Sequence, residues 1–244
     1  MKLVTHVHTR YSKDSMLCFW PLYLKCCLLK INAIAITEHD NIAGSIAFKK
    51  FCEKRKKHIL VIVGEEIFTS EGEIIGLYLK ENIPANLSAK ETIYRIQRQN
   101  GLIYIPHPYD TKRQRTVLKE TVISNNKESI DCIEVHNGRN ISSEYDKRQS
   151  AIAEKYNLNQ VIGSDAHTWI EIGRDYMEVN ILPDSPEKFR LAIQNAVFHP
   201  KKCIRIAHQI TRLIKIAKLI KSGKYYELYR AIIGKIKRGQ HRGC

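Results

Sequence analysis

Residues 2–8, Lys2-Leu3-Val4-Thr5-His6-Val7-His8, join a run of apolar and β-branched residues to two histidines. Such a run predicts a β-strand. Residues i and i+2 of a strand point to the same face, so His6 and His8 can hold one ion together. An HxH pair alone is weak evidence for a metal site, because such pairs are common on protein surfaces. Its interpretation depends on whether other ligand-type residues follow the same pattern.

The same arrangement returns along the sequence, because five further predicted strands end in histidines or acidic residues. Counting His6 and His8 of the first strand, six of the ten histidines lie at predicted strand ends. Imidazoles and carboxylates gathered at one end of a parallel sheet make a metal site, so the pattern predicts a metalloenzyme. The five strands are 33–37 before Glu38-His39-Asp40, 59–63 before Gly64-Glu65-Glu66, 102–106 before His107, 130–135 before His136, and 160–164 before Asp165-Ala166-His167.

The predicted strands alternate with helical patterns, which implies right-handed βαβ crossovers and a mainly parallel sheet. An open doubly wound sheet would concentrate ligands at one switch point, whereas here ligand-type residues follow six successive strands. We therefore expect an α/β fold closed into a distorted seven-stranded (β/α) barrel, with residues 72–79 as an extra hairpin strand. The seven core strands are expected at 2–7, 32–37, 59–65, 102–106, 130–135, 160–163 and 176–181.

Helices are expected between these strands, each placed by a capping or first-turn residue. Pro21 suits the first turn of a helix that ends near Lys30, and Pro186 plays the same part later. Ser88 predicts a helix N-cap, with Glu91 as its capping-box partner. The other helices are expected after Gly44 and at about 115–125 and 143–156.

Charge divides the chain of 244 residues into two parts. The net charge is +15, and residues 201–244 carry thirteen Lys or Arg against one acid, Glu227. We expect a barrel over residues 1–200 and a basic tail over 201–244 with two amphipathic helices, one on each side of Gly223. Such a tail packs on the barrel, binds an anionic membrane or meets nucleic acid, and the sequence leaves these alternatives open.

The seven cysteines contain no CxxC pair, and most lie in apolar stretches. We interpret them as reduced thiols of a cytoplasmic protein. The most apolar stretch, residues 16–36, is interrupted by Pro21, Lys25, Lys30 and Asn32, which argues against a membrane span. The N-terminus enters a strand at once and shows no signal peptide.

The strand-end residues mix imidazoles with carboxylates and include no cysteine. This mixture suits Zn²⁺, Mn²⁺ or Fe²⁺ and argues against soft-metal sites. The ligands are too many for one tetrahedral ion, so we expect two or three divalent ions per chain. Closely spaced metals clamp the oxygens of a phosphate ester and lower the pKa of a bound water to about 7.

Five sequence blocks resemble the polymerase and histidinol phosphatase (PHP) domain family over about residues 1–200. The resemblance implies a distorted seven-stranded barrel and a trinuclear metal-dependent phosphoesterase. The blocks, in chain order, are His6-Val7-His8-Thr9, Thr37-Glu38-His39-Asp40 with Gly44, Gly64-Glu65-Glu66-Ile67, Pro106-His107-Pro108 and Gly163-Ser164-Asp165-Ala166-His167.

The resemblance also implies a role for each ligand-type residue. It assigns His6, His8, Glu66 and Asp165 to a first metal, with Glu66 bridging, and Asp14, His39 and His167 to a second. His107 belongs to a third site, where Glu73 stands in a region in which relatives often have a histidine. Val4 stands where the family often has an acid, so one carboxylate contact to a ligand is expected to be missing.

Catalytic, metal-binding or phosphate-binding roles are expected for further residues, and each of several has a purely structural alternative. Asp165, His39 and Asp40 are expected to be catalytic, although Asp40 and Glu38 alternatively orient His39. Asp14 is alternatively a helix cap, Glu73 an exposed hairpin residue, and His136 either packed or part of a third site. The expected phosphate-binding residues, alternatively solvated loop charges, are Arg10, Lys13 and Arg139.

The function expected from these features is hydrolysis of phosphomonoesters, or of nucleotide or nucleic-acid phosphodiesters, by metal-activated water. One rival is an amidohydrolase-like metal hydrolase, which also has HxH after its first barrel strand; the Asp165-x-His167 pair and seven strands argue against it. The other rival is a catalytically weak metal-binding module tethered to nucleic acid or membrane by the basic tail. The near-complete ligand set argues against that module.

Overall fold

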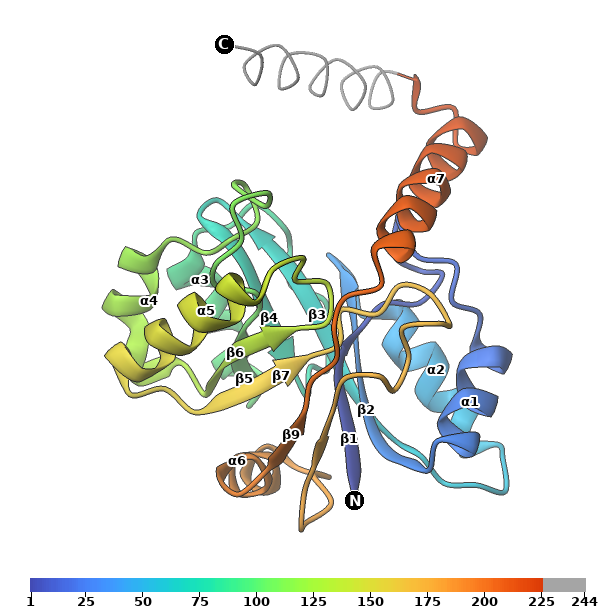
Figure 1. The fold of residues 1–244 in the computed structure, drawn as a ribbon, viewed down its shortest axis with the longest axis horizontal. Helices are drawn as coiled ribbons and strands as arrows, with labels where there is room; N and C mark the ends of the chain where they lie inside the picture. The colour runs from blue at the N-terminus through green and yellow to red at the C-terminus, as the bar shows by residue number, and fades with distance from the viewer. Residues whose placement is uncertain (226–244) are drawn as a thin grey trace.

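The computed structural model describes residues 1–225, and in this range one nine-stranded sheet curls into a nearly closed barrel flanked by helices (Figure 1). Its first seven strands lie in the reverse of chain order, from β7 back to β1. The barrel closes where Ala166, just after β7, bridges Val7 of β1. The predicted α/β barrel class is confirmed. The seven strands are β1 (Lys2–Val7), β2 (Ile31–His39), β3 (Leu60–Thr69), β4 (Gly72–Leu77), β5 (Leu102–Ile105), β6 (Cys132–Asn137) and β7 (Gln160–Gly163).

The identity of one barrel strand differs from the prediction. β4, expected as a hairpin beside the barrel, is a full barrel strand that runs antiparallel to both β3 and β5. The expected last strand, 176–181, is shortened to β8 (Tyr176–Glu178) and runs antiparallel to the start of β1 outside the closure. A further strand, β9 (Val197–His199), extends it. A barrel with two antiparallel pairings results, because a hairpin brings β4 directly back onto β3.

The helices cover the barrel on two sides (Figure 1). α1 (Phe19–Leu28) and α2 (Ala43–Glu53) lie beside β1 and β2, while α3 (Ala89–Arg98), α4 (Glu120–Asn126) and α5 (Ser143–Tyr156) lie on the opposite side with the short 3₁₀ turn Lys127–Ser129. α4 begins five residues later than expected. The hydroxyl of Ser88 caps α3 by accepting from Glu91 N, but the Glu91 carboxylate pairs with Arg95 instead of completing a capping box.

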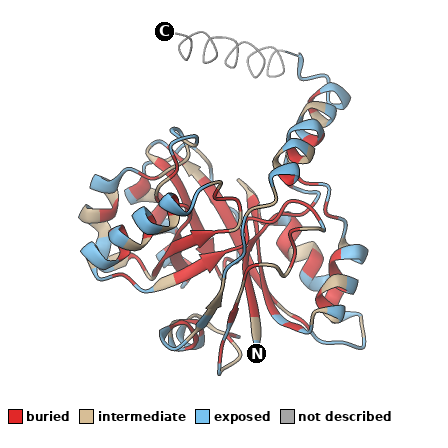
Figure 2. Ribbon diagram, in the orientation of Figure 1, coloured by how far each residue is buried: buried red, intermediate tan, exposed pale blue. Residues whose placement is uncertain are grey.

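Successive residues of the strands pack into different cores, as the period of two requires. Leu3 and Ala33 belong to one buried cluster, whereas Val4 and Ile34 pack with α1 and α2. Figure 2 shows the strands buried along most of their length, with exposure mainly on the outer faces of the helices and in the connecting loops. The sheet is therefore held rigidly from both sides, which fixes the positions of the side chains at its ends.

α6 (Pro186–Gln194) and β9 precede the tail, whose first helix is α7 (Arg205–Lys221), which rises from the barrel mouth (Figure 1). Ala207, Thr211 and Ile214 of α7 are buried against the barrel. Packing, one of the three alternatives for the tail, is thus what α7 does. The second predicted helix, after Gly223, lies outside the described residues, and contact of the tail with nucleic acid or a membrane stays a prediction.

Two smaller expectations concern the thiols and membrane spans. All six cysteines of the described part are free; Cys26, Cys52 and Cys132 are buried, whereas Cys18 is exposed. Within residues 1–225, no helix is both long enough and apolar enough to cross a bilayer.

Candidate metal centre

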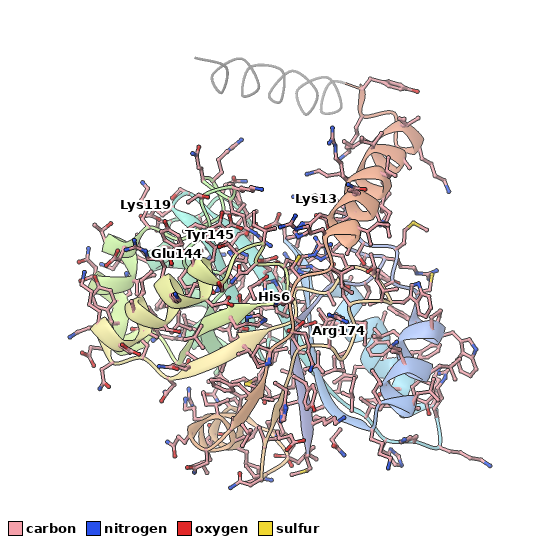
Figure 3. All side chains as sticks on the ribbon, in the orientation of Figure 1. His6, Lys13, Lys119, Glu144, Tyr145 and Arg174 are labelled. Carbon is pink, nitrogen blue, oxygen red and sulfur yellow. The ribbon has the colours of Figure 1, made fainter. Side chains whose placement is uncertain are left out.

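The strand-end residues meet in one place, at the barrel mouth beneath α7. They come from the ends of β1, β2 and β3, from β4, and from the segments after β5 and β7. Figure 3 shows His6 deep between the two halves of the molecule and Lys13 above it, beside α7. Parallel strands place their carboxyl ends on one edge of the barrel, which is why residues far apart in sequence converge here.

Glu66 lies at the centre of the group. One carboxylate oxygen lies 3.3 Å from His6 Nε2 and 3.0 Å from His107 Nε2. The other lies 3.4 Å from His8 Nε2 and 3.0 Å from His39 Nδ1. Four imidazoles therefore face a single, almost fully buried carboxylate, the geometry expected of a carboxylate that bridges ions.

Two aspartates and Glu73 complete the group. Asp165 Oδ1 lies 3.7 Å from His8 Nε2 and 3.4 Å from His167 Nδ1. Asp14 Oδ1 lies 3.4 Å from both His39 Nε2 and His167 Nε2. Glu73 Oε2 lies 3.5 Å from His107 Nε2, and its residue is 6% exposed, which excludes the alternative of an exposed hairpin residue.

The backbone is strained at three of these positions. His6, His107 and Asp165 have φ values of 58°, 28° and 49°, in the left-handed region that non-glycine residues seldom adopt. A register shift between Val4 and Val7 accompanies the first of them. His6 and His8 therefore share a face through a bulge, not through regular strand alternation, and such strain concentrates at functional sites.

Neighbouring side chains fix the orientation of the imidazoles. Glu134 of β6 lies 2.7 Å from His6 Nδ1 and accepts hydrogen bonds from Tyr104 Oη and His107 N, each at 2.7 Å. It provides the carboxylate contact that Val4 cannot. Ser12 Oγ lies 3.2 Å from His8 Nδ1 and donates to Glu38. Contacts of this kind set the tautomer and angle of a metal-binding imidazole.

The charges of the group are strongly coupled. Burial alone would raise the pKa of Glu66, but His6 and His39 outweigh it and hold that pKa well below its usual range. Burial likewise opposes the low pKa of Asp165, and Arg113 with His6 reverses the effect. Burial, with His167 and His39 nearby, lowers the pKa of His8 well below its usual range. Ionised carboxylates and a neutral His8 are the protonation states that metal ligation requires. Burial would lower the pKa values of His6 and His39, but nearby carboxylates raise both well above the usual range, so these two imidazoles would lose a proton when a cation binds.

Buried ligand atoms without partners test whether the site fits a metal. His6 Nε2, His8 Nε2 and Asp14 Oδ1 are buried and make no hydrogen bond. Buried polar atoms are normally satisfied, so such orphans point to an ion. Ligand atoms come within 4.8 Å of one another in four groups, and the donor set therefore fits divalent cations. The groups are His8-His39-His167, His6-Glu66-His107, His6-His8-Asp165 and His39-Glu66-Glu73.

Four expected residues are not brought into this group. His136 lies between Asp146 and Asp175, 3.0 and 3.1 Å from their carboxylates, and belongs to none of the groups of possible ligands, as expected of a packed histidine. Asp40 Oδ1 accepts a hydrogen bond from Phe68 N at 2.8 Å, and Asp40 belongs to none of the four groups of possible ligands. Arg10 and Arg139 are the other two.

Of the three expected phosphate-binding residues, only Lys13 keeps a free side chain at the site. Arg10 lies over the ring of Phe19, 5.6 Å from its centroid, on the outer surface. Arg139 borders the cavity but is held by Glu171 and donates to Thr211 Oγ1 and Ala207 O of α7. Arg139 therefore anchors α7, because its donors are committed to protein acceptors.

Three residues that contact the proposed ligands or their segments were not predicted from the sequence: Arg113, Glu134 and Glu171. Arg113 Nη2 lies 2.6 Å from Asp165 Oδ2 and its Nε 3.2 Å from Asp110. Glu171 accepts from His167 N and Thr168 N and so fixes the segment after β7. Arg113 lies in an irregular segment without a pattern, whereas Glu134 could have been found as a lone acid inside an apolar strand.

A cavity of about 1050 Å³ opens above the group. Its floor includes Asp14, His39, Glu73, Asp165 and His167, and its walls are the 110–116 segment and α7. Arg113 borders it as well. A small molecule can therefore reach the metal-binding group through this cavity.

Comparison with known proteins gives a consistent assignment. The PHP domain family model matches residues 5–231, a range that includes α7. The uncharacterized protein MJ0417 of Methanocaldococcus jannaschii is 38% identical over 199 residues, which are 78% of this chain and 77% of that protein. The chain belongs to the PHP domain family.

Solved structures show the same fold. One is a two-domain protein from Bacteroides vulgatus that contains a predicted PHP-like metal-dependent phosphoesterase, with TM-score 0.64 and 22% identity over 82% of this chain. The present chain covers 65% of that longer one, less than two thirds. Another is an amidohydrolase from Chromobacterium violaceum, solved with sulfate and no metal, with TM-score 0.58 and 14% identity; the match covers 82% of this chain and 99% of that one.

Proposed function

We propose that this protein is a metal-dependent phosphoesterase that hydrolyses phosphomonoesters or phosphodiesters of nucleotides or nucleic acid. The observation that carries the proposal is Glu66, whose two buried oxygens face four imidazoles at 3.0–3.4 Å, below a cavity bordered by cations. Membership of the PHP domain family supports the hydrolase class. The substrate is a proposal resting on the chemistry of the cavity.

The residues present would hold two or three divalent cations, such as Mn²⁺, Zn²⁺ or Fe²⁺. His6, His8, Glu66 and Asp165 would hold one and Asp14, His39 and His167 a second, with Glu66 shared. His107 and Glu73, 3.5 Å apart, would hold a third. Bound there, the cations supply an activated water and neutralise the oxygens of the phosphate ester.

The protein's own groups do the positioning. Arg113 keeps Asp165 ionised and presents a guanidinium at the cavity, where it can hold a phosphate oxygen. His39, 15% exposed at its side chain, and the buried Asp165 border the cavity and are the groups placed to move protons there. Lys13 borders the same space and adds positive charge for a phosphate.

The test is hydrolysis of an aryl phosphate monoester and of the matching diester by Mn²⁺-loaded protein. Asp165→Ala removes a central carboxylate, and Asp184→Ala, at an exposed pair with Lys188, is the matched control. We expect turnover by the unmodified protein and by Asp184→Ala, with at least a roughly thousandfold loss in Asp165→Ala.

The outcomes separate the candidate functions. The preferred ester decides between phosphatase and phosphodiesterase. Turnover unchanged in Asp165→Ala overturns the proposed site. Absence of turnover on both esters with metal bound overturns the general phosphoesterase and favours the metal-binding module. Cleavage of an aryl amide without cleavage of either ester favours the amidohydrolase.

A further inference from the structure

α7 presents three different faces. Ala207, Thr211 and Ile214 are buried against the barrel. Ile206, Leu213 and Ile220, seven residues apart, are exposed on the outside. A third face borders the cavity and carries most of the charge of the helix. Its members include Arg205, His208, Arg212, Lys215 and Leu219.

The position of α7 over the cavity is fixed by two of its contacts. Lys218 Nζ donates to the carbonyl oxygens of Arg10, Ser12 and Ser15, at 2.9, 2.7 and 2.6 Å. These carbonyls belong to the loop that carries Asp14. About two to three turns before Lys218, on the same face of the helix, Arg139 donates to Thr211 Oγ1 and Ala207 O. A helix tied by two cations to the segments that build the metal centre is part of the site, not an appendage.

The cavity holds more positive charge than its acidic floor neutralises. Arg205, Arg212 and Lys215 of α7 line the cavity together with Lys13 and Lys112. Among residues 1–225, none of these five side chains forms an ion pair or a hydrogen bond with a carboxylate. Arg113 and Arg139, by contrast, are both paired with acids. Five uncommitted cations around one cavity favour an anionic occupant.

We propose that the substrate carries a second phosphate group beside the one cleaved, and that Arg212 and Lys215 of α7 bind it. The inference rests on the proposed phosphoesterase function and specifies its substrate class. One phosphate engages the floor, where Arg113 and the metal ligands lie. The cavity, at about 1050 Å³, is far larger than one phosphate, and the α7 cations lie above that floor.

The distribution of charge favours a substrate over a macromolecular surface. The cations turn into the cavity, whereas the outer face of α7 exposes Ile206, Leu213 and Ile220. A nucleic-acid duplex laid along the helix would meet apolar side chains, although a single-stranded end can enter the cavity. A second phosphate reaches Arg212 and Lys215 in two ways, on a compact bisphosphate or on the next unit of a nucleotide chain.

Binding is tested with a matched, non-hydrolysable pair, propane-1,3-diylbisphosphonate and propylphosphonate, titrated calorimetrically into the Mn²⁺-loaded full chain. We expect the bisphosphonate to bind at least about tenfold more tightly, as charge-assisted hydrogen bonds allow. The advantage should shrink between about 0.1 M and about 1 M salt, where the Debye length falls from ~10 to ~3 Å.

The variant Arg212→Ala/Lys215→Ala is expected to abolish the tenfold advantage. Lys202→Ala/Lys221→Ala removes the same two charges from exposed positions of the tail that do not border the cavity, and it should keep the advantage. Equal affinity for both phosphonates, or an advantage that survives in Arg212→Ala/Lys215→Ala, overturns the proposal. Loss of the advantage in both double variants also overturns it, because overall charge would then be the cause.

Two substrate pairs distinguish the sources of the second phosphate. One compares fructose 1,6-bisphosphate with fructose 6-phosphate, and the other compares a 5′-phosphorylated thymidine dinucleotide with thymidine monophosphate. Preference for the first bisphosphate identifies a compact substrate, and preference for the dinucleotide identifies a nucleotide chain. Failure of aryl ester hydrolysis would refute the phosphoesterase, whereas equal phosphonate binding refutes the second-phosphate site alone.

Discussion

Replacing Glu66 by glutamine is the sharpest perturbation of the metal centre, because the side chain keeps its shape and loses its charge. The carboxylate oxygens lie 3.0–3.4 Å from nitrogens of His6, His8, His39 and His107. An amide leaves one poor ligand oxygen and turns an NH₂ group toward the imidazoles. The proposed bridging contact between neighbouring ions would be lost.

The size of the effect follows from the number of contacts removed. Residues that only orient a metal ligand change affinity by about 10–100-fold when mutated. Glu66 contacts the ion-binding space directly, so we expect Glu66→Gln to weaken Mn²⁺ or Zn²⁺ binding by at least about 100-fold, or about 2.7 kcal/mol. The assay is a calorimetric metal titration of the purified chain at neutral pH.

Glu65→Gln is the matched control, one residue earlier on β3 and facing the other way. Glu65 Oε2 accepts a hydrogen bond from Ile83 N at 3.0 Å, and burial raises the pKa of Glu65 to about 8. The carboxyl is therefore mostly neutral at neutral pH, and an amide replaces it with little electrostatic change. We expect metal affinity to be unchanged. Equal losses in Glu65→Gln and Glu66→Gln, or none in Glu66→Gln, would refute the bridging role.

Two further predictions concern residues beside the metal centre. Burial would lower the pKa of His136, but its two carboxylate partners outweigh it and raise the pKa to about 9. The pKa of His136 is higher in the folded protein than in the unfolded chain, so protonated His136 stabilises the fold. This stabilisation is complete below about pH 6.5 and disappears as the pH rises through about 9. Relative to His136→Phe, it amounts to about 3 kcal/mol of the free energy of unfolding. Urea unfolding of both proteins at several pH values checks this, and a pH-independent difference would contradict it. At Gly163, an added Cβ would lie 1.8 Å from Glu134 Oε1, so Gly163→Ala should cost about 1–3 kcal/mol of stability and weaken metal binding roughly tenfold by moving the His6 partner. Lower stability with unchanged metal affinity would show that Glu134 does not position His6.

The strand ends were predictable because two local rules agree there. β-branched runs identify strands, and the residue after a strand faces the barrel mouth. His6, Glu66 and His167 follow these rules, and the structure brings them together. The rules failed where pairing is decided by distant contacts: the isolated pattern of 176–181 says nothing about whether it closes the barrel or pairs antiparallel with the start of β1.

The roles of irregular and amphipathic segments were harder to predict from the sequence. Arg113 lies in a segment without periodicity, and only the folded chain brings it 2.6 Å from Asp165. The helical spacing of α7 was visible in the sequence, but an amphipathic pattern does not name the surface that a helix covers. The contacts of Lys218 with carbonyls more than 200 residues earlier in the chain are long-range and have no local pattern.

The order of the chain separates the two halves of the site. Every proposed metal ligand lies between His6 and His167, whereas the helical wall of the cavity begins only at Arg205. Changes on the cavity-facing side of α7 can therefore alter which molecule is accepted without replacing any ligand, as long as Lys218 and Thr211 keep their contacts with the barrel. In such a protein, specificity can diverge at one end of the chain while the proposed ligands at the other end stay the same.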